Sequence, residues 1–228
     1  MSDLATMRTK VIGIVRDDSA KLANPADYEA KVAAAINQYS KYRPAVAVAD
    51  IQGNGTHDYS LPTGWNDEFS GITGVEYPSG RVPEEMLDLE DWGLYQSPTG
   101  KKIRIRNYVP SVGETIRVTF TILRTATTIP TVDVESVCQL AAALCLEELA
   151  NAFAQAGDST IDADSVNYRT KSAEFAARAK RLMQLHKEHM GLKENDITPP
   201  ASAVTDLNEN FPGGSDRLTH PRWARERR

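Results

Sequence analysis

Two long stretches of helical apolar periodicity, joined by one short polar break, dominate residues 133–190 of this sequence. In the first stretch apolar side chains recur at steps of three and four from Val134 to Phe153, and in the second from Tyr168 to Met190. Such spacing places the apolar side chains on one face of an α-helix. Because the connecting run is short, we expect an antiparallel helical hairpin about 35–40 Å long.

The first of these helices is apolar around nearly its whole circumference. Leu140, Ala142, Ala143 and Leu146 lie off its main apolar stripe. A helix of this kind is buried on more than one side, and here the second side can be another subunit. The arginines of the second helix also lie away from its apolar stripe. We therefore predict a subunit interface formed by Leu140, Ala143, Leu146, Arg169, Arg178 and Arg181.

Residues typical of a helix start and of a helix end flank the predicted hairpin. Thr131 or Asp133 can act as the N-cap of the first helix, and Asp133 and Glu135 place negative charge at its positive end. Gly191 is a natural stop for the second helix.

The N-terminal region predicts two shorter helices. Apolar side chains recur at helical spacing from Leu4 to Val15, and again from Tyr28 to Tyr39. Between them, Asn24 followed by proline is a good helix start.

The period changes to two between residues 45 and 130. The clearest strand is 115–123, and Ile103 and Ile105 alternate with arginines in the same manner. The run 97–100, Ser-Pro-Thr-Gly, predicts a hairpin turn that pairs this second strand with residues 92–96.

These elements predict an α+β fold, with a four-helix bundle core, an inserted small antiparallel β domain and an extended C-terminal arm. The expected parts are the N-terminal helices of the bundle at 1–44, the β domain at 45–130, the helical hairpin at 131–192 and the arm at 193–228.

The expected arm has a divided charge. Residues 194–216 contain five acidic residues and no Lys or Arg, whereas 217–228 contain five Arg and one Glu. Such a segment orders on a partner rather than alone. It could contact DNA phosphates, dock on a protein or have no role, and the interleaved apolar side chains favour a protein. The docking residues would be Arg217, Leu218, His220, Pro221, Arg222, Trp223, Arg225, Arg227 and Arg228.

Composition excludes several classes of protein. The sequence is 41% hydrophobic and 25% charged, and it has no run of 18–20 apolar residues, so we expect no membrane association. A net charge of -5 argues against a general nucleic-acid coat. The N-terminus lacks the pattern of a signal peptide, and Cys138 and Cys145 are expected to be buried thiols in a reducing cytoplasm.

The sequence offers no catalytic constellation, and we expect neither an enzyme nor a bound metal or cofactor. His186 and His189 are one helical turn apart, but they lack a third metal ligand. The acidic run 84–91 lacks the ligand spacing of a calcium loop, and the Gly-rich run 53–56 lacks the lysine of a phosphate loop.

The order of elements resembles the head-to-tail adaptor (connector, neck) proteins of tailed bacteriophages. The similarity rests on the short helix opening Leu4-Ala-Thr-Met-Arg, the helix end Tyr39-Ser-Lys-Tyr, and the runs 140–150 and 157–182. It is strongest from Val134 to Leu185 and poor in the β insertion.

This resemblance implies a structural protein of the virion neck, assembled in the host cytoplasm as a homo-oligomeric, commonly dodecameric, ring. The ring would lie below the portal protein, with the arm in the portal and a neck, stopper or tail protein on the far side. Double-stranded DNA would pass through its channel without sequence-specific binding. It would thus link capsid to tail and take part in DNA ejection.

Three alternatives stay open at this point. One is a neck stopper or tail-terminator ring. Another is a hydrolase built around His186, His189 and the acidic run. The third is a carbohydrate- or surface-binding module in the β domain, which exposed Trp65 and Trp92 in one patch would support.

Overall fold

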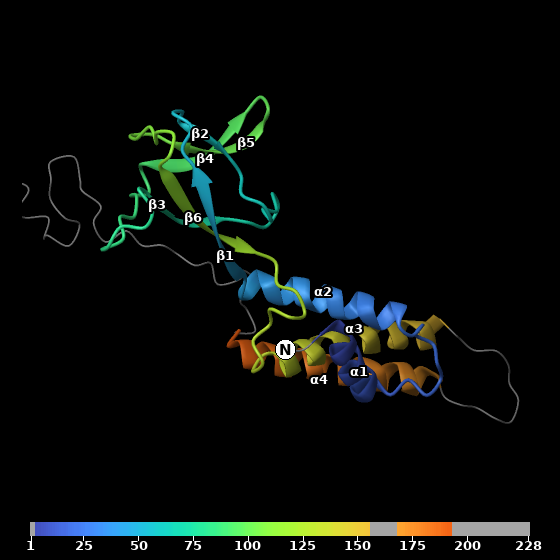
Figure 1. Cartoon of the computed structure of the whole chain (residues 1–228). Coiled ribbons are helices and arrows are strands. Elements are labelled where there is room, and N and C mark those ends of the chain that lie inside the picture. Colours follow the sequence, from blue (N-terminus) through green and yellow to red (C-terminus); the bar gives the residue numbers. More distant parts are fainter. Residues whose placement is uncertain (1–2, 156–167, 193–228) are drawn as a thin grey trace, which may run out of the picture. The chain divides into compact units, whose positions relative to one another are not determined.

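A computed structural model describes residues 3–155 and 168–192. Within these ranges the chain forms a helical unit from residues 3–46, 66–70 and 121–192, and a β unit from residues 47–65 and 71–120 (Figure 1). Four helices and two small antiparallel sheets make this an α+β protein, which confirms the predicted fold class. The chain returns to the helical unit at Thr121, earlier than the expected boundary at 130.

The helical unit contains α1 (Leu4–Val15), α2 (Ala26–Tyr42), α3 (Val134–Gln155) and α4 (Tyr168–Met190). The side chain of Asp3 caps α1 by accepting a hydrogen bond from the Thr6 amide at 2.7 Å. At the other end, Gly191 follows α4 with a φ of +72°, the left-handed conformation that only glycine adopts without strain.

Helix α3 is the central helix of the unit. Its buried side chains, with those of α1 and α2 and Ala179 of α4, form one continuous apolar core. α3 is long and apolar enough to cross a membrane, with a mean hydropathy of 1.3, but 61% of that stretch is buried by the chain itself. Burial of this kind is typical of the core helix of a folded domain.

The β unit contains two three-stranded sheets. The first has the order β1 (Ala45–Gln52), β6 (Thr115–Ile122) and β3 (Ile72–Glu76); the second has the order β2 (Asp58–Ser60), β5 (Gly100–Ile105) and β4 (Trp92–Ser97). The predicted hairpin is confirmed, because Ser97 of β4 pairs with Gly100 of β5.

The predicted alternation of the last strand is confirmed by burial. Ile116, Val118 and Phe120 of β6 are 1%, 0% and 1% exposed, whereas the residues between them are half-buried. Ile103 and Ile105 of β5 are also buried, so each sheet contributes apolar side chains to the interior of the β unit.

Candidate functional site

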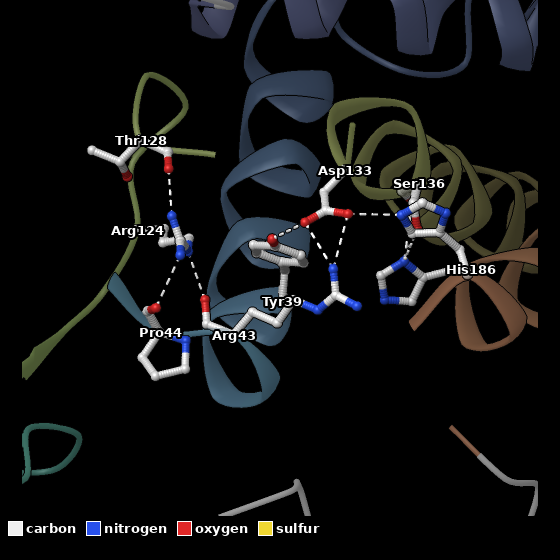
Figure 2. A network of polar contacts seen from close by, with 9 residues as sticks. Tyr39, Arg43, Pro44, Arg124, Thr128, Asp133, Ser136 and His186 are labelled. Atoms are coloured by element: carbon white, nitrogen blue, oxygen red, sulfur yellow. Dashed lines mark hydrogen bonds and ion pairs between the residues drawn. The ribbon is translucent and has the colours of Figure 1, made fainter. Parts of the chain in front are cut away.

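The most connected polar site of the described chain lies in the helical unit, around the carboxylate of Asp133. This residue comes directly before α3 and is 2% exposed. Its Oδ2 accepts hydrogen bonds from the Tyr39 hydroxyl at 2.5 Å and from Arg43 Nη1 at 3.0 Å. Its Oδ1 accepts from His189 Nε2 at 2.7 Å. One carboxylate therefore joins α2, the residue after α2, and α4 (Figure 2).

We call these four residues, with Ser136 and His186, the Asp133 junction. Asp133 was expected to cap α3 electrostatically, and its carbonyl does accept from the Val137 amide at 3.0 Å. Its side chain, however, bonds to other helices. The junction therefore fixes how three helix ends meet.

The protonation states of the junction follow from its burial and its bonds. Burial by itself raises the pKa of Asp133, but hydrogen bonds from Tyr39, His189 and Arg43 outweigh it, and the pKa is lowered from its ordinary value. Burial and the bond to Asp133 raise the pKa of Tyr39 to about 12. At neutral pH the junction thus holds an ionised carboxylate and a neutral phenol.

His186 occupies the inner side of the junction and is 2% exposed. Its Nδ1 lies 2.8 Å from Ser136 Oγ and 3.1 Å from the Ser136 carbonyl oxygen. Because a carbonyl only accepts, Nδ1 carries the hydrogen in that contact, and Nε2 has no partner within the described chain. Burial lowers the pKa of His186, so the ring is neutral at neutral pH.

Arg124 makes a second set of contacts at the end of α2. Its guanidinium donates to the carbonyl oxygens of Arg43 (2.6 Å), Pro44 (3.0 Å) and Thr128 (2.5 Å), as Figure 2 shows. Its backbone amide donates to Ser40 Oγ at 3.0 Å. These bonds join the segment that leaves the helical unit to the segment that returns to it.

The chemistry available at the junction is limited by access. Ser136 and His186 place a hydroxyl beside an imidazole, as a nucleophile and base would lie, but they are only 3% and 2% exposed. The carboxylate that would orient such a base bonds to His189 instead. In residues 3–155 and 168–192 no group of three His, Cys, Asp or Glu side chains could hold a metal ion. The arrangement therefore serves to join helices.

The cysteines are free and buried in the core. Burial raises the pKa of Cys138 to about 11 and that of Cys145 to about 12, which keeps both thiols protonated at neutral pH.

The structure changes the argument for the predicted subunit interface. Leu140, Ala143 and Leu146 are 3%, 0% and 0% exposed within a single chain. Side chains of the same unit bury these three residues, so their apolar character does not require a neighbouring subunit, whereas Glu135, Glu147 and Asn151 of α3 are exposed. The apolar character of α3 can therefore arise within one chain, and the subunit interface at these three residues stays a prediction.

The arginines of the predicted interface belong to α4, and two of them can be placed in detail. Arg178 and Arg181 are exposed. Arg178 also donates a hydrogen bond, at 3.0 Å, to the carbonyl oxygen of Ile14 near the C-terminal end of α1. Arg169 lies in the first turn of α4. The interface at these residues stays a prediction.

The predicted docking residues 217–228 lie outside the described residues.

The other sequence candidates have local structural roles. The Gly-rich run 53–56 forms the turn between β1 and β2, as predicted; at Gly53 a Cβ atom would lie 2.2 Å from the Ser111 carbonyl oxygen. In the acidic run, Glu85 pairs with Arg81 at 2.8 Å. Trp92 is only 9% exposed and Trp65 packs 6.0 Å from the Phe120 ring, so they do not form the exposed patch of a surface-binding module.

Sequence analysis missed the roles of Tyr39, Arg43 and Arg124. Tyr39 has the position of an ordinary core residue in the apolar stripe of α2, and the two arginines fall in segments with no motif. Only the pairing of distant segments reveals them.

Comparison with known proteins adds the following. No protein-family model and no curated protein matches the chain. Among solved structures, the chain is similar to one described as the neck of an empty GTA particle computed with C6 symmetry, at 14% identity and a TM-score of 0.29, covering 75% of this chain and 87% of the other. A structure of a native gene transfer agent (GTA) virion gives 14% identity and a TM-score of 0.28, with the same coverage. At these values the similarity establishes neither family nor function.

Proposed function

We propose that this protein is a structural head-to-tail adaptor of a tailed phage-type particle, located in the virion neck. In this role it forms a homo-oligomeric ring below the portal protein, links the capsid to neck or tail proteins, and lets double-stranded DNA pass. The proposal starts from the similarity of runs 140–150 and 157–182 to that family.

The observation that supports a structural role most directly is the Asp133 junction. Its central carboxylate is buried and accepts hydrogen bonds from Tyr39, Arg43 and His189, so it stabilises helix packing instead of facing a substrate.

Helix α4 supplies the surface for neighbours in this proposal. Of its residues from Lys171 to Met190, only Ala179 and His186 are buried. Its outer face carries both exposed positive side chains and small apolar ones, among them Arg181 and Ala177. We propose that this face contacts the next subunit, and that residues 217–228 beyond it bind the portal.

The portal contact is tested by removing residues 217–228 from the full chain. We expect loss of co-purification with the portal protein, while the circular dichroism and thermal unfolding of the helical unit stay unchanged. A matched control replaces Arg81 with Gln, because Arg81 is an exposed arginine in the β unit. Retained portal binding by the truncated chain would overturn the assignment of the arm.

The subunit contact is tested separately by Arg181→Glu. We expect this reversal to reduce ring formation on the portal, whereas Lys10→Glu, an exposed change on α1, leaves it intact. Equal ring formation by both variants would place the interface elsewhere.

A further inference from the structure

An open hollow of about 450 Å³ lies on the β unit, beside β5 and the segment that leads into β2. Its lining combines two arginines and a histidine with a single carboxylate. The lining residues are Thr56, His57, Asp58, Arg104, Ile105 and Arg106.

The carboxylate of the hollow is already fully paired. Arg104 Nε and Nη2 donate to the two oxygens of Asp58 at 2.6 and 2.8 Å. The same guanidinium lies 3.4 Å above the centre of the Tyr95 ring, a cation–π contact that fixes its plane. Asp58 and Tyr95 thus hold the Arg104 guanidinium in place on β5.

Arg106 has no carboxylate partner among the described residues. Its Nη1 donates to the Glu90 carbonyl oxygen at 3.1 Å, which neutralises no charge. Its Nη2 lies beside Gly93, where a Cβ atom would approach to 3.0 Å. The glycine therefore leaves space for the guanidinium next to β4, and the hollow keeps one uncompensated positive charge.

The imidazole of His57 also lines the hollow, and a hydrogen bond holds it in place. Its Nδ1 donates to the Ile105 carbonyl oxygen at 2.7 Å, so the imidazole is held against β5. On the same face of β5, Lys102 precedes Arg104 by two residues, about 6.6–6.8 Å along the strand. Lys102 and Arg104 thus lie on one face of β5, and Arg106 follows directly after the strand ends at Ile105.

We propose that this hollow binds a phosphate group, carried by a nucleotide or by a nucleic-acid strand. Guanidinium groups held by other contacts lose little freedom when they bind, and their planar donors match phosphate oxygens. A hollow of this volume has room for a sugar or base next to the phosphate. This site does not depend on the adaptor role, because it lies within the β unit of a single chain.

The test uses the full chain and two probes. Inorganic phosphate is titrated by calorimetry, and a fluorescent single-stranded oligodeoxynucleotide is titrated by anisotropy. We expect saturable binding of at least one probe, weakened about tenfold or more in Arg106→Gln, since a charge-assisted hydrogen bond is lost. Binding of both probes identifies the phosphate itself as the ligand; binding of the oligonucleotide alone identifies the strand.

The matched control is Arg81→Gln, which removes an exposed arginine of the same unit that does not line the hollow. It should bind within about twofold of the wild type, a change far below the tenfold step of one lost contact. Arg106→Lys retains the charge and serves as a second variant if Arg106→Gln unfolds. Its affinity should lie between that of the wild type and that of Arg106→Gln. No saturable binding of either probe, or equal loss in Arg106→Gln and Arg81→Gln, overturns the proposal.

Discussion

An arginine–aspartate pair of the helical unit, Arg43–Asp133, and one of the β unit, Arg104–Asp58, differ in what surrounds them. In the helical unit, Asp133 is buried and also accepts from Tyr39 and His189, so its carboxylate is saturated by the fold. In the β unit, Asp58 and Arg104 are partly exposed and line an open hollow. The same two residue types thus have different roles. The buried pair joins helices, whereas the solvent-accessible pair holds a guanidinium in place.

The largest expected effect comes from breaking the buried pair. Asp133→Ala leaves the donors of Tyr39, Arg43 and His189 without their acceptor and should lower the free energy of unfolding by about 3–5 kcal/mol. Denaturant unfolding followed by circular dichroism measures this. The matched change Asp58→Ala removes a partly exposed partner and should have a clearly smaller effect. Equal losses would mean that the difference in burial does not distinguish the two pairs.

A smaller loss is expected at the segments that connect the units. Arg124→Ala removes three bonds from a guanidinium to carbonyl oxygens and should lower the free energy of unfolding of the helical unit by about 2 kcal/mol. Hydrogen exchange at the end of α2 should increase in the same variant. Arg81→Ala, whose ion pair joins two exposed side chains, is the control and should change stability by less than about 1 kcal/mol.

The junction should also respond to acid. The folded pKa of His186 lies below its ordinary value of 6.5, so the unfolded state binds the proton first. Its contribution to stability is present above pH 6.5 and is lost as the pH falls through the folded pKa, at a rate of no more than about 1.4 kcal/mol per pH unit. The free energy of unfolding, compared at pH 7.5 and 5.5, should fall less in His186→Gln than in the wild type. If the free energy of unfolding falls equally in both proteins, His186 is not the source of the pH dependence. The control is His57→Gln, the same substitution at an exposed histidine.

The smallest expected effect is a gain. Gly13 lies inside α1, and a Cβ atom there would meet nothing within 4 Å. Gly13→Ala should therefore raise the free energy of unfolding by about 0.5–1 kcal/mol through helix propensity alone. Gly53→Ala in the β unit should instead destabilise, since its Cβ would collide with the Ser111 backbone. Thermal unfolding distinguishes the two signs.

Sequence patterns predicted the elements well where periodicity is strong. The hairpin at Ser97 and Gly100 and the alternation of β6 were predicted because turn residues and a period of two act locally. The subunit interface at Leu140, Ala143 and Leu146 stays a prediction, because periodicity shows that a residue is buried but does not show what covers it, and within one chain these three residues are already buried.

The sequence by itself determined which segments are helices and strands, because backbone preference and apolar spacing act over a few residues. Only the tertiary structure decided which side chains meet. Asp133 bonds to Tyr39, Arg43 and His189, which are 94, 90 and 56 residues away along the chain. No local pattern carries such pairings, since they arise when the packing of apolar faces brings the helix ends together and a buried carboxylate must then find donors.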